Sequence, residues 1–321
     1  MEHKMTAQNN NTKGILFILC GMALFSLQDS LIKFVYQEAA LYEIYFGRTF
    51  IAAIILLAYL KIIGHKIVLK THYPLLTITR VLLHFFAFSF FFISLTYMSL
   101  AMANALFFSS PFFISIFAKI FLKEQIGIRR WSAIFVGFVG VFIVLNPDFS
   151  DFDYKNLLPV LCAFCYSVSM TITKLTSDKD NVYTQLFYFY FVALALCALI
   201  FIFTGKGQFN IFSDPTMQFI FRDWFTNGYY AWKFILIMGI AASISFVCVF
   251  SAYSVASPST ISLFEYSLII WAIIIGYFLF DEIPNLRIFI GITLIIGAGI
   301  YIFMREKVRD QSITVEAPKR R

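Results

Sequence analysis

A carboxylate inside an apolar segment of membrane length is the side chain of this sequence best suited to chemistry. Glu265 lies in segment 258–280, whose other residues are mostly apolar or small. A bilayer has no water to solvate a charge, so Glu265 needs a proton, a protein partner or a water-filled cavity. Ser262 precedes it by one helical turn and Tyr266 follows it. We predict that these three residues lie on a path for a substrate or a proton. The other candidates for this path are Asp29, Lys33, Arg48, His84 and Asn104.

Other ionisable residues also fall inside apolar segments. Asp29 and Lys33 lie late in the first segment and Arg48 lies early in the second, so helical geometry places them at similar depth. His84, in the third segment, falls at the depth of Glu265. We favour a functional role for Asp29, Arg48 and Glu265, because charges inside a bilayer are rare outside such paths. For His84, proton exchange and simple packing are equally good explanations.

Motifs for enzymatic chemistry are missing from the sequence. It has no GxxxxGK[ST] phosphate loop, no HExxH metal motif and no GxSxG nucleophile motif. Cys162 and Cys165 have the CxxC spacing of redox and zinc sites, but no second CxxC or neighbouring histidine accompanies them. We interpret both cysteines as small residues of a buried helix. The sequence therefore predicts no enzyme, no metal and no cofactor.

The elements that carry these residues are membrane-spanning helices. Hydrophobic residues make up 60% of the chain and charged residues 13%, more apolar surface than a soluble fold of this length can enclose. We predict an all-α integral membrane protein in a lipid bilayer, with polar tails at 1–13 and 305–321. Ten segments have the ~20 residues that a span requires: 14–35, 41–63, 75–97, 101–122, 130–146, 156–175, 182–204, 230–255, 258–280 and 286–304.

The lysines and arginines predict the orientation. With the N-terminus in the cytoplasm, seventeen of them fall on the inner side and five on the outer side. Both termini are therefore expected in the cytoplasm. Near that surface, ion pairs that fix helix packing or snorkelling towards the headgroups are the expected roles of Lys119, Lys123 and Lys174. The net charge of +7 reflects this topology. No segment outside the spans interleaves basic and aromatic residues, so we expect no nucleic-acid partner.

The two halves of the sequence resemble each other. A shift of 158 positions aligns Glu282 with Glu124 and Ser262 with Asn104, and a shift of 141 aligns Lys174 with Lys33. We predict two five-helix repeats, 14–146 and 156–304, separated by an acidic connection. An odd number of spans in each repeat makes the two repeats inverted in the membrane.

The aligned carboxylates stand at helix ends. We predict that Glu124 and Glu282 are structural and accept hydrogen bonds from free backbone N–H groups of the following helix. Glycines in the fifth and tenth spans indicate close helix contact, either within one chain or in a homodimer.

The longest connection, 205–229, mixes aromatic and charged residues. We interpret it as an interfacial segment on the membrane surface, with a lid over a substrate site as the alternative.

Several short motifs, in this order and spacing, resemble one family. They are Phe46-Gly47-Arg48, Ser110-Pro111, Phe121-Leu122-Lys123-Glu124, Phe264-Glu265-Tyr266 and the run from Phe278 to Pro284. Together with the ten spans in two halves, they are similar to the EamA type of the drug/metabolite transporter superfamily, and most of all to its S-adenosylmethionine and riboflavin uptake proteins. The resemblance covers nearly the whole chain.

This resemblance implies a secondary transporter of the cell inner membrane. Its central cavity would be formed by the first four helices of each half, with the fifth and tenth helices at the periphery. The expected function is the movement of a small organic metabolite by alternating access, with proton coupling or exchange as the possible driving reactions. S-adenosylmethionine, riboflavin and amino-acid-like compounds are the candidate substrates. The alternative is a membrane sensor or assembly protein that transports nothing.

Overall fold

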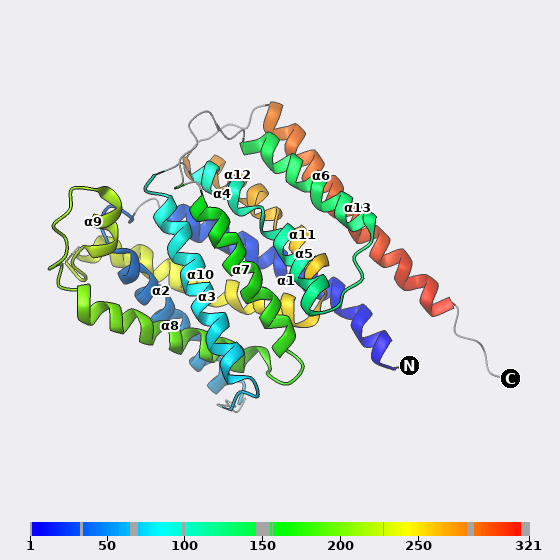
Figure 1. Cartoon of the computed structure of the whole chain (residues 1–321), viewed down its shortest axis with the longest axis horizontal. Helices are drawn as coiled ribbons and strands as arrows, with labels where there is room; N and C mark the ends of the chain where they lie inside the picture. The colour runs from blue at the N-terminus through cyan, green and yellow to red at the C-terminus, as the bar shows by residue number, and fades with distance from the viewer. Residues whose placement is uncertain are drawn as a thin grey trace.

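The computed structural model describes residues 2–32, 35–64, 70–97, 100–145, 155, 157–226, 228–280 and 286–315. These residues form thirteen α-helices and no strands (Figure 1). The helices are α1 (Glu2–Ile32), α2 (Leu41–Ile62), α3 (Pro74–Ser94), α4 (Leu100–Phe107), α5 (Ser110–Phe121), α6 (Ile128–Leu145), α7 (Leu157–Thr176), α8 (Val182–Thr204), α9 (Pro215–Phe221), α10 (Gly228–Val255), α11 (Pro258–Phe264), α12 (Ser267–Phe280) and α13 (Leu286–Val315).

Seven helical stretches of the described residues are long and apolar enough to cross a bilayer, with α11 and the start of α12 counted as one. They are Asn11–Ile32, Leu41–Ile62, Pro74–Ser94, Leu157–Thr176, Val182–Thr204, Tyr229–Val255 and Pro258–Ile275. The other three expected spans correspond to the pair α4–α5, to α6 and to α13. The all-helical membrane fold is confirmed, whereas the full set of ten spans stays a prediction.

The first and last helices extend beyond the spans expected from the sequence. α1 begins at Glu2 and α13 ends at Val315, so both run into the polar tails. Neither tail stretch contains a glycine or a proline that would stop a helix. Residues 2–13, expected as a polar tail, are therefore helical.

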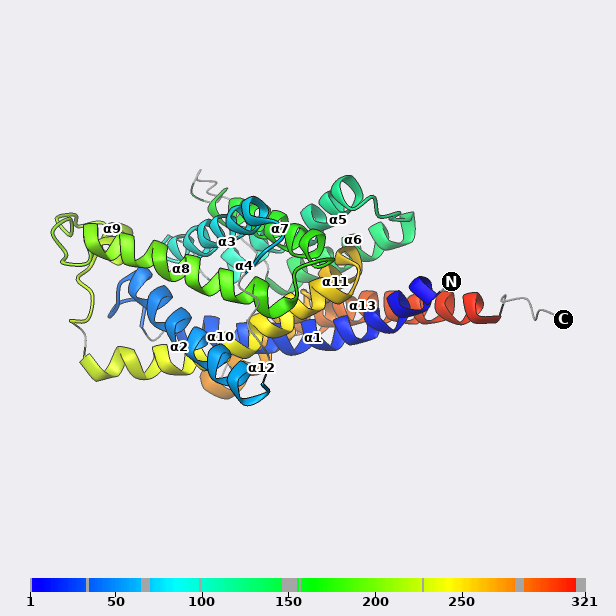
Figure 2. The same ribbon diagram turned by 90° about the horizontal axis from the view of Figure 1, so that it is seen from below.

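The bundle has two layers, which Figure 2 shows edge-on. In one layer α1 packs between α10 and α12, and α2 packs on α10. In the other layer α7 packs on α3, α4 and α5, and α8 packs on α3. The layers meet through contacts of α2 with α8, of α10 with α7 and α8, and of α11 with α5. Side chains that point between the layers therefore come from sequence positions far apart.

Two of the expected spans are broken helices. The fourth is divided into α4 and α5 at residues 108–109, and the ninth is divided into α11 and α12 at Glu265 and Tyr266. Pro111 in the first turn of α5 lacks the N–H that a continuous helix would use. The second break contains no proline or glycine and instead places a buried carboxylate at the interruption.

α6 and α13 form a pair along one edge of the bundle, outside the two layers (Figure 1). Gly140 permits their close approach, because a Cβ atom there would lie 2.8 Å from the carbonyl oxygen of Gly291 and 3.0 Å from side-chain atoms of Leu294 and Ile295. These two glycines thus serve a contact within one chain, one of the two explanations expected from the sequence. The peripheral position of the fifth and tenth expected spans agrees with the family resemblance.

The segment from Gly205 to Thr226, with α9 at its centre, lies against the bundle end opposite the chain termini (Figures 1 and 2). Arg222 donates to the carbonyls of Tyr36 and Ala39 at 3.3 and 3.4 Å, and the Phe225 N–H donates to Glu43 at 3.1 Å. Trp224 is buried against Phe46 and Phe201. These contacts tie the segment to the α1–α2 turn and the start of α2, so we refer to residues 205–226 as the cap.

The bundle end nearer the N-terminus is held by polar contacts between helices. Arg80 of α3 is fully buried and donates to the side chain and carbonyl of Gln185 in α8 at 2.6 and 2.8 Å. Lys174 at the end of α7 donates to the Ser254 carbonyl at 2.9 Å, which neutralises the C-terminal end of α10. Lys174 thus fixes the packing of α7 against α10, although its partner is a carbonyl and not the carboxylate of an ion pair.

Asp180, in the turn between α7 and α8, joins this end of the bundle to the start of α3. Its buried carboxylate accepts hydrogen bonds from the backbone N–H of His72 at 3.0 Å and from the Thr71 hydroxyl, and it lies 3.0 Å from the His72 ring. Burial opposes ionisation, but these hydrogen bonds outweigh it and hold the pKa of Asp180 below its ordinary value. The contact thus ties the chain that leads into α3 to the α7–α8 turn.

Candidate functional site

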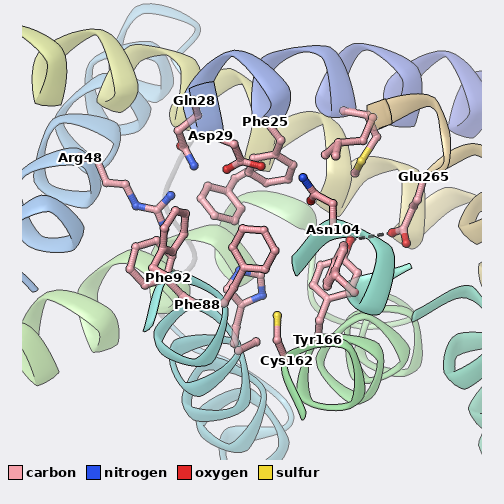
Figure 3. Close-up of a pocket in the computed structure, with 17 residues that line it drawn as sticks. Phe25, Gln28, Asp29, Arg48, Phe88, Phe92, Asn104, Cys162, Tyr166 and Glu265 are labelled. Carbon is pink, nitrogen blue, oxygen red and sulfur yellow. Dashed lines mark hydrogen bonds between the residues drawn. The ribbon is translucent and has the colours of Figure 1, made fainter. Parts of the chain in front are cut away.

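A cavity of about 100 Å³ lies between the two layers. One layer contributes lining residues from α1, α2, α10, α12 and the break before α12, and the other contributes residues from α3, α4 and α7. The lining is mostly aromatic and apolar, with a few ionisable and amide side chains (Figure 3). The lining residues are Met22, Phe25, Gln28, Asp29, Arg48, His84, Ala87, Phe88, Phe91, Phe92, Asn104, Phe107, Cys162, Tyr166, Phe246, Glu265 and Leu268.

Glu265 supplies a carboxylate to the cavity from the break between α11 and α12. The residue is 1% exposed, and its Oε1 accepts hydrogen bonds from the hydroxyls of Tyr166 and Tyr253, both at 2.6 Å. Both hydroxyls therefore donate to the same carboxylate oxygen. Oε2 and the Ser110 hydroxyl lie near enough to interact, but neither forms a regular hydrogen bond within the described residues. One carboxylate oxygen therefore accepts two hydrogen bonds, and the other accepts none of regular geometry within the described residues.

Arg48 supplies a guanidinium from the opposite side of the cavity (Figure 3). It is 2% exposed, and its Cζ lies 4.2 Å from the ring centre of Phe88, 4.7 Å from that of Tyr45 and 5.8 Å from that of Phe246. Aromatic faces attract a cation, and a planar guanidinium also stacks on them. Within the part of the chain that the structure describes, Arg48 forms no ion pair. The rings therefore hold a buried cation, whose Nε forms no hydrogen bond within the described residues.

Three further residues predicted from the sequence reach the same cavity. Asp29 lines it from α1 and Asn104 from α4, and Figure 3 shows both side chains between Arg48 and Glu265. His84 lines it from α3, with its ring 4.8 Å from that of Phe189 and its Nδ1 without a hydrogen bond among the described residues. The structure thus brings together side chains from five different parts of the sequence.

Ser262 and Tyr266 do not line the cavity. Tyr266 is buried towards α6, where its hydroxyl donates weakly to the Ile134 carbonyl at 3.3 Å and its ring leaves no space for a side chain at Gly137. Ser262 is fully buried, and its hydroxyl turns back to the Ser259 carbonyl at 3.4 Å. The prediction assumed one continuous helix, whereas the break at Glu265 separates these neighbours. Lys33, the remaining predicted path residue, lies outside the described residues.

Glu124 is engaged as a helix-end carboxylate, but with different partners from those expected. It accepts hydrogen bonds from the hydroxyls of Ser257 and Ser259 at 2.8 and 2.5 Å, and Arg130 lies 4.0 Å away. These partners replace, among the contacts of the described residues, the backbone N–H donors expected from the following helix, α6. The serines stand at the start of α11, so Glu124 links the end of α5 to a helix of the other half. Glu282 lies outside the described residues.

The two tyrosines that bind Glu265 were not predicted from the sequence. Tyr166 lies in α7 and Tyr253 near the end of α10, and both are buried. A tyrosine in an apolar span must find a partner for its hydroxyl, which is a usable but unspecific signal among the chain's seventeen tyrosines. Only the fold shows which of them meet a carboxylate.

The cysteines are free within the described structure. Cys162 is buried and lines the cavity, while Cys165, three residues later, is half-buried outside it. Among the described residues no group of three or more histidine, cysteine or acidic side chains could hold a metal ion.

Comparison with protein families gives two matches in the chain. The model described as the EamA-like transporter family matches residues 12–146 and again residues 154–304. Together these stretches cover most of the sequence.

Curated proteins of similar length also match. An S-adenosylmethionine uptake transporter of Rickettsia bellii is 28% identical over 294 residues, 92% of this chain and 94% of its own. A riboflavin transporter of Vibrio cholerae is 25% identical over 96% of this chain and 98% of its own. A pseudopaline exporter of Pseudomonas aeruginosa is 23% identical over 92% and 97%. The relatives therefore include both uptake proteins and an exporter.

A solved crystal structure superposes on this chain with a TM-score of 0.75 and covers 92% of this chain and 99% of its own. The sequence identity is 14%, so this likeness concerns the fold alone.

Proposed function

The chain belongs to the EamA-like transporter family, and on this premise we propose that it is a secondary transporter that carries a small organic metabolite through the cavity between its layers by alternating access. The observation that carries the proposal is the cavity itself. A guanidinium and carboxylates converge in a mostly apolar bundle, where charges are costly unless they bind a substrate or relay protons.

The chemistry of the lining favours a substrate with charges of both signs and a flat ring. Arg48 can bind a carboxylate, Glu265 or Asp29 can bind a cationic group, and Phe88 and Phe107 offer ring faces between them. S-adenosylmethionine combines a carboxylate, positive charges and an adenine ring. It is therefore our first candidate, ahead of riboflavin, which carries no positive charge, and of simple amino acids, which lack the adenine ring.

Entry of such a substrate requires a conformational change that enlarges the cavity. Small-molecule sites have volumes of roughly 300–1,000 Å³, whereas this cavity measures about 100 Å³. The cap lies at one end of the bundle and the polar contacts of Arg80, Lys174 and Glu124 at the other. We interpret the described conformation as closed, with transport opening the two ends in turn.

We propose further that the halves are inverted five-helix repeats. The two family matches support this, and so do the breaks in the fourth and ninth expected spans, which fall at nearly the same place when the halves are aligned. The proposed location is the inner membrane with both termini in the cytoplasm. A homodimer stays a prediction, as does the choice between proton coupling and exchange.

Reconstitution tests the proposal. Purified protein in liposomes should take up labelled S-adenosylmethionine faster than protein-free liposomes, with saturation, and unlabelled compound should compete. Riboflavin and amino acids, run in parallel, define the substrate class. Arg48→Lys keeps the charge but loses the planar guanidinium, so we expect uptake to fall by roughly tenfold. Folded protein that takes up none of the panel would favour the sensor or assembly alternative.

A further inference from the structure

We propose that Tyr166 and Tyr253 act as a clamp that holds Glu265 as an anion, and that the free oxygen of this anion binds a positively charged group of the substrate. The inference rests on the proposed transport function and extends it to named positioning residues and to the charge of the ligand. Tyr166 lines the cavity beside Glu265, whereas Tyr253 does not line the cavity and acts on the substrate only through Glu265.

The geometry of the two hydrogen bonds supports the clamp. Both tyrosines donate to the same oxygen, Oε1, at 2.6 Å. Each donor stabilises the charged form of the carboxylate. Because α7 and α10 contribute one donor each, the position of Glu265 is fixed from two sides.

The second oxygen, Oε2, is the feature that points to a ligand. It is fully buried and forms no regular hydrogen bond within the described residues, although the Ser110 hydroxyl lies near the carboxyl group. A buried carboxylate oxygen without a donor is unfavourable unless something occupies it. Glu265 also forms no ion pair with any described residue. A ligand cation would satisfy the charge and the vacant acceptor together.

The other ionisable groups around the cavity come from different helices, and Asp29 is the second carboxylate among them. Arg48 lies on the opposite side, within its aromatic rings, and Asp29 reaches the space between them from α1. His84 faces the cavity from α3 and Cys162 from α7. Tyr266, the next residue, is turned towards α6.

The experiment compares a cationic ligand with a near-isosteric ligand that has one positive charge fewer. S-adenosylmethionine and S-adenosylhomocysteine differ by the methyl group that makes the sulfur positive. Affinities are measured on the purified full-length protein, for the wild type, Tyr253→Phe, Glu265→Gln and the double variant. Tyr190→Phe is the matched control, since it removes a buried hydroxyl that has no partner among the described residues and does not line the cavity.

We expect the wild type to prefer the cationic ligand and Glu265→Gln to lose the preference. Tyr253→Phe should reduce it roughly tenfold, the effect of one hydrogen bond to a charged group. In the Glu265→Gln background, Tyr253→Phe should not change the preference further, because the amide carries no negative charge for the tyrosine to stabilise. Tyr190→Phe should keep the full preference. Equal losses for both ligands, or losses that persist without Glu265, would overturn the proposal and leave Tyr253 a structural role.

A second readout separates failure of the clamp from failure of the proposed substrate. Infrared difference spectra between the wild type and Glu265→Gln identify the bands of this carboxyl group without any ligand. The clamp predicts an ionised carboxylate in the wild type and a protonated group once Tyr166 and Tyr253 are both phenylalanine. If the wild type binds neither compound but shows the ionised band, the substrate assignment fails and the clamp stands. A protonated Glu265 in the wild type would reject the clamp itself.

Discussion

Replacement of Glu124 by glutamine should open the end of the bundle nearer the N-terminus. Two serine hydroxyls at the start of α11 donate to this carboxylate at 2.8 and 2.5 Å and so connect α5 to α11. A hydrogen bond to a charged group contributes about 1.5–3 kcal/mol and one between neutral groups about 0.5–1.5 kcal/mol. The substitution therefore weakens each contact by roughly 1 kcal/mol.

The two contacts together correspond to roughly 2 kcal/mol, or about thirtyfold in the equilibrium between closed and open states. The Glu124 side chain is 17% exposed, and solvent reduces the effect. We expect the open population to rise by about tenfold. Because the amide oxygen of the introduced glutamine still accepts hydrogen bonds, the yield of folded protein should change little.

Cys162 provides the assay, because it is a free cysteine in the wall of the cavity. In a variant that keeps only this cysteine, the rate of modification by an impermeant thiol reagent reports access from either face of oriented vesicles. Glu124→Gln should raise the rate about tenfold from the face that carries the N-terminus and not from the other. Ser257→Ala together with Ser259→Ala should act similarly and add little to Glu124→Gln. An unchanged rate in normally folded protein would refute the reasoning.

Three further predictions concern the framework. Asp180→Asn should lower the thermal midpoint at neutral pH. Because folding holds the pKa of Asp180 below its ordinary value, the carboxylate stabilises the fold above that value and stops doing so as the pH falls through the folded pKa. Melting curves of the wild type and the variant should therefore converge in acid and stay apart in base. In the same melting assay, Gly140→Ala should destabilise the protein by about 1–3 kcal/mol, because the added Cβ atom would clash with the backbone carbonyl of Gly291. Gly297→Ala is the control and should be neutral, because the space around Gly297 is open. In a cysteine-free background, a single cysteine in place of the exposed Gln208 should react with an impermeant thiol reagent from outside the cell. A single cysteine in place of Lys179 should react only from inside. The opposite pattern would reverse the proposed orientation.

Much of the helix framework follows from the sequence alone. The expected spans 41–63 and 182–204 differ by at most one residue at each end from α2 and α8. Long apolar runs bounded by polar residues leave a chain in a bilayer no alternative to a helix. The breaks at residues 108–109 and 265–266 were not predicted, because Pro111 and Glu265 are each also compatible with one continuous span, and the break at Glu265 contains no proline or glycine.

The charged residues of the candidate site could be predicted from the sequence, but their hydrogen-bond partners could not. Asp29, Arg48 and Glu265 stand out because charge is rare in an apolar span, and the structure places all three around one cavity. Tyr253 is separated from Glu265 by a connection and a helix, so only the packing of α10 reveals their hydrogen bond. Tyr266, adjacent to Glu265 in sequence, is turned away from it by the break. At an interrupted helix, residues adjacent in the sequence can therefore face different parts of the structure.

The length of α10 makes the thickness of the surrounding membrane relevant to the cavity. Its 28 residues extend over about 42 Å, against a hydrocarbon core of about 30 Å. A helix this long must tilt or project from the bilayer, and its tilt changes with the length of the lipid tails. Tyr253 lies in the last turn of α10, where a change of tilt causes the largest displacement. Short-tailed and long-tailed lipids would therefore shift this hydroxyl relative to Glu265, so we expect the charge preference of the cavity to depend on the host membrane.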